Sequence, residues 1–167
     1  MNEQNRNRII IDDMFLTVDV PTTAGSKVLE GYQSPTQATA ITKAQAAGYV
    51  LAMKTPVGEF AIDLLGETAV SGAWGRDGIV KNLTAEMLWW ENDAKGAFCL
   101  DVNGYPRRAA AQMGLVCLKP THGAISREGI VSVAASGETV DILAKTVEDC
   151  RELFDAIAED PKKEDAP

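Results

Sequence analysis

Three aspartates follow apolar segments, where catalytic or metal-binding carboxylates often stand. Asp12 and Asp13 come directly after the isoleucines of residues 9–11, and Asp101 follows the apolar residues 96–100. If both segments are strands, these carboxylates could meet at one end of a sheet and would suit Mg²⁺ or Ca²⁺. Nothing in the spacing shows that they converge, so we predict no metal site and no cofactor.

A second group of candidate residues surrounds Gly104. Pro106 and Arg107 follow it two and three positions later, so that a proline can begin a helix directly after the glycine. Backbone N–H groups at such a helix start can receive an anion or a carbonyl oxygen. The simpler interpretation is that Gly104 permits a tight turn, which an ion pair between Asp101 and Arg107 fixes. The candidate ligand-binding residues are Asp12, Asp101, Gly104, Tyr105 and Arg107.

Other chemically notable side chains have structural interpretations. His122 is the only histidine, and Cys99 lies in an apolar segment with no histidine expected beside it, so we predict that neither is catalytic. Trp89 and Trp90 are adjacent and would point about 100° apart on a helix. One of them is expected to contribute to an exposed apolar patch for a partner, unless a wide buried face covers both.

The elements that must position these residues alternate between strands and helices. Residues 8–12, 49–53, 96–100 and 115–118 have the apolar composition of strands, and residues 36–47, 83–94 and 106–113 have helical signals. A last helix begins near Thr146, which has capping-box spacing to Asp149. This alternation predicts the α/β class with a mostly parallel sheet.

One domain is expected in 167 residues, and we place it at residues 9–158. Residues 1–8 would form a polar extension, and residues 159–167 a disordered, charged tail. The net charge of −8 opposes direct nucleic-acid binding, which depends on cationic contacts. No apolar run reaches the roughly 20 residues of a membrane span, and the three cysteines lack metal-site spacing. We predict a soluble, cytoplasmic protein.

Several motifs, in the same order along the chain, resemble the amidase-signature family, and within it the A subunits of glutamyl-tRNA amidotransferases. Residues 11–14, IDDM, stand where the family has I-K-D-N, and residues 22–27, TTAGSK, resemble T-T-x-G-S-K. Residues 101–111, DVNGYPRRAAA, resemble D-T-G-G-S-I-R-Q-P-A-A, and residues 118–123, LKPTHG, resemble L-K-P-T-Y-G. With further matches, the resemblance spans about residues 9–155.

The resemblance implies an α/β/α sandwich around a mixed, largely parallel sheet. In active members it also implies a Ser-Ser-Lys site, in which a lysine helps one serine to deprotonate the nucleophilic serine. Here Asp12 stands in place of the lysine, and Tyr105 stands in place of the nucleophile. The bridging serine should come from a Gly- and Ser-rich loop, but residues 74–98 contain no serine, so we interpret that loop as deleted.

These substitutions predict a catalytically inactive amidase-like protein that acts by binding or by oligomeric assembly. Two alternatives stay open: an active enzyme, either an unusual amidase or an acid–base catalyst that uses Asp12 and Tyr105, and an accessory subunit of a transamidation complex. The family's domain is several hundred residues long, so this chain should leave a sheet edge and an apolar face uncovered. We predict that a second copy covers them in a homodimer or higher homo-oligomer, with a different protein as the alternative partner.

Overall fold

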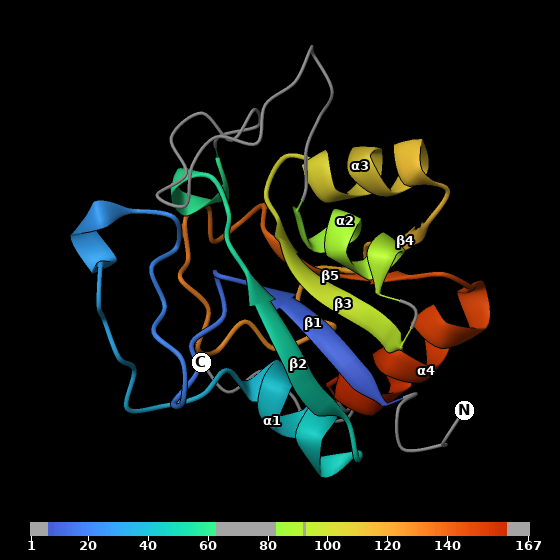
Figure 1. Ribbon diagram of the computed structural model, residues 1–167, viewed down its shortest axis with the longest axis horizontal. Helices are drawn as coiled ribbons and strands as arrows, with labels where there is room; N and C mark the ends of the chain where they lie inside the picture. Colours follow the sequence, from blue (N-terminus) through green and yellow to red (C-terminus); the bar gives the residue numbers. More distant parts are fainter. Residues whose placement is uncertain (1–6, 63–82, 92, 160–167) are drawn as a thin grey trace.

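The computed structural model describes residues 7–62, 83–91 and 93–159 (Figure 1). Within them, one five-stranded sheet contains β1 (Arg8–Asp12), β2 (Val50–Thr55), β3 (Ala94–Asp101), β4 (Val116–Leu118) and β5 (Thr139–Ala144), in the spatial order β2-β1-β3-β5-β4. β1 pairs in parallel with β2 and β3, whereas β5 is antiparallel to β3 and β4. The predicted mixed, largely parallel sheet is confirmed.

Helices cover both faces of the sheet. α1 (Thr39–Ala46) and α4 (Val147–Ile157) pack on one face, and α2 (Leu83–Trp90) and α3 (Tyr105–Met113) pack on the other (Figure 1). Short 3₁₀ turns lie at Lys27–Leu29 and Glu59–Ala61. The architecture is therefore the predicted α/β/α sandwich.

The three consecutive isoleucines of β1 show why this strand is buried on both faces. Ile9 and Ile11 belong to the core beneath α1 and α4, whereas Ile10 belongs to the core beneath α2 and α3. Alternating side chains of a strand point to opposite faces, so a central strand needs apolar residues at successive positions. β1 thereby fixes the place of Asp12, its last residue, at the end of the sheet.

Two helices are shorter than the sequence predicts. The helix expected over residues 36–47 begins only at Thr39, and Ser34 forms a turn with Thr36, donating to Thr36 O (2.7 Å) and accepting from Thr36 N (3.2 Å). The helix expected over residues 83–94 ends at Trp90, and Ala94 already begins β3. In contrast, Thr146 caps α4 as predicted, because its hydroxyl accepts from Asp149 N (3.1 Å).

The ends of the chain lie mostly outside the described residues, so the domain boundaries stay predictions. Glu159, which the sequence assigned to the tail, donates its N–H to Ala124 O (2.9 Å), and its side chain lies 2.8 Å from Lys43 Nζ. In the part of the chain that the structure describes, no helix is both long and apolar enough to cross a membrane.

A Gly96→Ala substitution tests how closely β3 packs against its neighbours. A Cβ atom at Gly96 would clash with Leu153 Cδ1 and would lie 2.6 Å from Leu143 O. We expect the variant to lose about 1–3 kcal/mol of unfolding free energy in urea denaturation, as overpacked cores do. The control is Gly137→Ala, because its Cβ would have only Ala134 O within 4 Å, at 3.9 Å. Equal stability of the two variants would contradict the packing described here.

Candidate functional site

Asp12 ends β1 as a fully buried carboxyl group. Its Oδ1 accepts from Met14 N (3.0 Å) and its Oδ2 accepts from Leu100 N (2.7 Å), so that it connects β1 to β3. Burial raises the pKa of Asp12 to about 7, although the two N–H groups act in the opposite direction. The position that the resemblance assigns to the family's lysine thus holds a buried acid whose pKa lies near neutral pH.

Tyr105 begins α3 and is only 5% exposed. Its hydroxyl group has no hydrogen-bond partner among the described residues. Burial, together with the nearby Asp12 and Cys99, raises the pKa of this phenol well above its ordinary value. Tyr105 therefore keeps its proton, and a protonated phenol is a weak nucleophile.

Two threonines complete the surroundings of Asp12, and sequence reasoning did not single them out. Thr84, from α2, lies with its Oγ1 2.5 Å from Thr55 Oγ1, and Thr55 donates to Ile11 O (3.1 Å). Cys99 lies beside Thr84, and burial raises its pKa well above the ordinary thiol value, as expected for a structural cysteine. α2 thereby packs over the end of β1. Residues 74–82 belong to the segment from which we interpret the Gly- and Ser-rich loop as deleted, and they lie outside the described residues.

The turn that starts α3 is fixed by Asp101. Its Oδ1 accepts from Gly104 N (2.5 Å), and its Oδ2 accepts from Arg107 Nε (2.6 Å), so the expected ion pair is present. Tyr105 N also has an internal acceptor, Asn103 Oδ1 (3.3 Å). Gly104 has a φ of +86°, which favours glycine. Because both N–H groups at this turn are engaged within the chain, they are not free donors for a bound carbonyl oxygen.

A second buried carboxyl group, Asp141 of β5, lies beside Asp101. Its Oδ1 accepts from Thr139 Oγ1 (2.8 Å), and its Oδ2 is 3.9 Å from Arg107 Nε. Burial, followed by the charge of Asp101, raises the pKa of Asp141 to about 7. Burial also acts to raise the pKa of Asp101. Hydrogen bonds from Gly104 and Arg107, together with Asp141 and Lys119, outweigh burial, so the pKa of Asp101 is lowered. Asp101 is thus the ionised member of the pair.

Lys119 joins this carboxylate pair from the segment after β4. Its Nζ lies 3.4 Å from Asp101 Oδ2 and donates to Thr139 Oγ1 (2.5 Å). Cys117 Sγ lies 3.6 Å from Asp141 Oδ2, and burial raises the pKa of this thiol above its ordinary value. The Thr139 hydroxyl thus accepts from Lys119 and donates to Asp141, so it is engaged within the cluster on both sides.

Asp13 pairs with Lys54 of β2, at 3.0 Å between Oδ1 and Nζ. Lys54 also donates to Thr22 Oγ1 (2.6 Å), and Thr22 in turn donates to Phe15 O (3.3 Å). Burial lowers the pKa of Lys54 below its ordinary value, although the charge of Asp13 acts in the opposite direction. The contact between Lys54 and Thr22 joins the loop that contains Thr22 to β2. The proton of the Thr22 hydroxyl is already donated to Phe15 O.

The remaining sequence candidates have no catalytic surroundings. Within the described ranges, no group of three or more His, Cys, Asp or Glu side chains could hold a metal ion. His122 Nε2 lies 2.9 Å from Ala135 O, on a surface loop, which fits the structural role expected for it.

Comparison with known proteins places the chain in a family. The model of the Amidase family matches residues 9–76 and 96–167, and the chain therefore belongs to the amidase family. The A subunit of the glutamyl-tRNA(Gln) amidotransferase of Acinetobacter baumannii is 35% identical over 158 residues, which cover 87% of this chain and 31% of the relative. The protein of the same name from Thermobifida fusca is 38% identical over 159 residues, covering 90% and 32%.

Solved structures agree with this assignment. The A subunit of the glutamyl-tRNA(Gln) amidotransferase of Thermotoga maritima superimposes with a TM-score of 0.78 at 27% identity, covering 93% of this chain and 36% of that one. A variant of the Kluyveromyces lactis allophanate hydrolase superimposes with a TM-score of 0.81 at 25% identity, covering 95% and 26%. The chain thus spans about a third of the length of the curated relatives it matches. Residues 77–95, which include α2, lie outside the family match.

The two buried acids predict an unusual pH dependence of stability. Asp12 and Asp141 hold protons in the folded state up to about pH 7, whereas ordinary aspartates lose theirs near pH 3.8. The folded chain then binds more protons than the unfolded chain between these values. The free energy of unfolding should therefore fall as the pH rises through this window, by at most about 1.4 kcal/mol per pH unit for each group.

Urea denaturation between pH 4.5 and pH 7.5 measures this slope. Asp12→Asn and Asp141→Asn should each make it shallower, whatever their effect on absolute stability. The exposed Asp19→Asn controls for the change in net charge. An unchanged slope in both buried variants would contradict the assignment.

Proposed function

We propose that this chain is an amidase-family protein that does not hydrolyse amides and acts by binding to, or assembling with, other protein chains. What supports the proposal is that the two positions that the resemblance assigns to the family's lysine and nucleophilic serine hold a buried acid, Asp12, and a buried phenol, Tyr105. Asp12 is engaged by backbone N–H groups of Met14 and Leu100, and Tyr105 holds its proton. Amide cleavage needs a nucleophile, a proton acceptor and oxyanion donors, and the first two have no counterpart in these residues.

The active-enzyme alternative is less well supported. An acid–base pair of Asp12 and Tyr105 would need access to a substrate, but Asp12 is fully buried and Tyr105 is 5% exposed. The alternative of an accessory role in a transamidation complex has support of its own, because the relatives from Acinetobacter baumannii and Thermobifida fusca are named as amidotransferase subunits. We therefore keep it as the second candidate function. A cytoplasmic location stays a prediction.

Turnover assays test the loss of catalysis. We expect no release of ammonia from glutamine, asparagine or an aryl amide above the rate in buffer, with an active amidase of the family as positive control. If turnover is found, Tyr105→Phe and Asp12→Asn distinguish a real activity from a contaminant. A rate that falls at least 100-fold in either variant would reject the inactive assignment, whereas a rate that is the same in both would indicate contamination.

Assembly can be measured on the purified chain. We predict a homodimer or higher homo-oligomer because β2 and β4 each have one neighbouring strand within the described residues, and such edges are prone to pairing. Light scattering coupled to size-exclusion chromatography should then report at least twice the 17.9 kDa of one chain. A stable monomer at micromolar concentration would contradict self-association and would leave a different protein as the partner.

A further inference from the structure

Arg107 carries hydrogen-bond donors that the chain itself does not use. Its Nε donates to Oδ2 of the buried Asp101 (2.6 Å), and 46% of the Arg107 side chain stays exposed. Within the described residues, neither terminal nitrogen of the guanidinium group makes a hydrogen bond. Asp101 thus holds the group in place through Nε, and the terminal N–H groups are left to solvent or to a ligand.

The guanidinium group lies over Gly104, where no side chain obstructs it. A Cβ atom at Gly104 would lie 2.9 Å from Arg107 Nη2 and 3.3 Å from Cζ. The missing side chain therefore leaves room for the group at the start of α3, and the bond to Asp101 fixes it there. A guanidinium group that is already held in this way loses little conformational entropy when a ligand binds.

A second cation approaches the same carboxylate oxygen. Lys119 Nζ lies 3.4 Å from Asp101 Oδ2, and 28% of the Lys119 side chain is exposed. Two cations therefore share one ionised carboxylate, because the neighbouring Asp141 has a pKa of about 7 and keeps its proton below that pH. Cys117, which lies beside Asp141, is neutral as well, since burial raises the pKa of its thiol. The cluster thus has an excess of positive charge in a chain whose net charge is −8.

We propose that Arg107 and Lys119 form a binding site for the carboxylate group of a ligand. The terminal N–H groups of a guanidinium match the two oxygens of a carboxylate in spacing and plane, so the contact can be bidentate. A single carboxylate neutralises the excess charge of the cluster, whereas a dianion such as sulfate reverses it. The carboxylate belongs either to a small molecule or to an acidic side chain of another protein. The site does not depend on whether the chain cleaves amides, so this inference goes beyond the proposed function.

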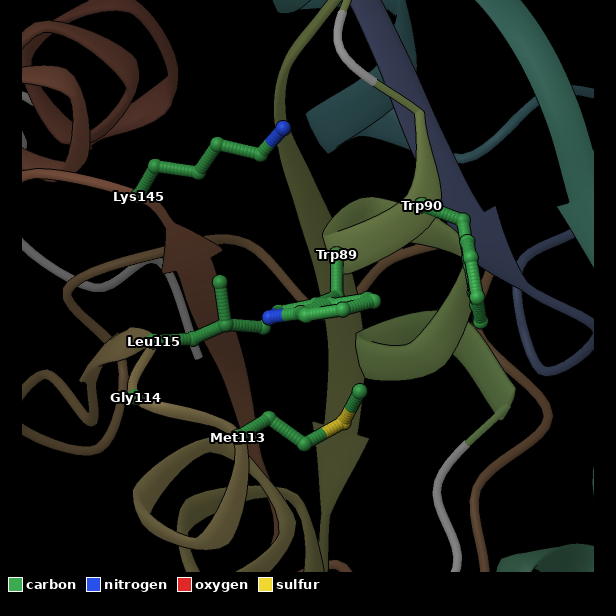
Figure 2. A pocket seen from close by; sticks show the side chains of 6 residues that line it. All are labelled: Trp89, Trp90, Met113, Gly114, Leu115 and Lys145. Carbon is green, nitrogen blue, oxygen red and sulfur yellow. The ribbon is translucent and has the colours of Figure 1, made fainter.

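Lys145 does not offer a comparable site, although it lines a groove of about 480 Å³. Trp89 and Trp90 line the same groove, are 47% and 68% exposed, and contact each other with ring centroids 4.9 Å apart (Figure 2). The exposure that the sequence predicts for one of these tryptophans is therefore confirmed. Lys145 Nζ, however, already donates to Glu91 O (3.0 Å), and Lys145 is the one charged residue that lines this groove.

An NMR titration of the ¹⁵N-labelled full chain tests the proposed site. Sodium acetate replaces sodium chloride at constant ionic strength and at pH 6, below the pKa of Asp141. The Arg107 Nε–H resonance and the backbone N–H resonances of residues 101–108 are followed. We expect them to shift with saturation, at a dissociation constant on the order of 10 mM. Sodium sulfate at the same ionic strength should bind more weakly than acetate.

Two variants distinguish the site from a general effect of charge. Arg107→Lys keeps the charge but removes the planar group, and Lys119→Gln removes the second cation. Each should weaken acetate binding about fivefold or more, measured on the backbone resonances. The matched control is Arg108→Lys, because Arg108 is the next residue of α3, is exposed, and has no ion pair within the described residues. It should bind acetate like the unmodified chain, and circular dichroism should show all three variants folded.

The capped peptide Ac-GGEGG-NH₂, whose glutamate side chain is its only charge, distinguishes the two sources of the carboxylate. Binding about tenfold tighter than acetate would assign the site to an acidic segment of a protein, and equal or weaker binding would assign it to a small carboxylate. The absence of a saturable shift up to about 100 mM acetate, tighter binding of sulfate, or unchanged binding in both variants would each overturn the proposal. None of these results depends on amide turnover or on oligomeric state, so the proposed function stands or fails separately.

Discussion

The buried carboxyl group of Asp12 is the constraint on which the candidate site depends. Its two oxygens accept from Met14 N and Leu100 N, so it holds the end of β1 against β3 from inside the core. A buried acceptor of this kind is costly to leave unpaired, and the protein satisfies it with backbone rather than with a cation. Asp12 has no contact with solvent in this structure.

The layer between the sheet and helices α2 and α3 contains a second buried acid, Asp141, whose partners are side chains. Asp12 and Asp141 are both fully buried, and burial raises both pKa values to about 7. Asp101 stays ionised because Gly104 and Arg107 bind it directly. In this layer, Asp12 and Asp141 hold their protons to a higher pH than ordinary aspartates, whereas the hydrogen bonds of Asp101 stabilise its charged form.

Much of the core lies away from the candidate site. Ile9 and Ile11 pack beneath α1 and α4, and the chain superimposes on an amidotransferase subunit of which it covers only 36%. The segment that departs from the family, α2, contributes Thr84 and Leu88 to the interior and the tryptophans to the surface. This one helix therefore both packs over the end of β1 and exposes two indole rings.

The sequence by itself determined the family, the α/β/α architecture and the presence of Asp12 and Tyr105 in its motifs, because colinear motifs and the isoleucines of β1 are local signals. It also indicated the cap of α4, since Thr146 and Asp149 are only three positions apart in the chain. Tertiary structure alone decided the roles of Thr55, Thr84 and Asp141. β5, the strand that contains Asp141, was not predicted from the sequence. Asp141 lies close to Arg107, which belongs to α3. Such pairings join residues far apart in the chain, and no local pattern records them.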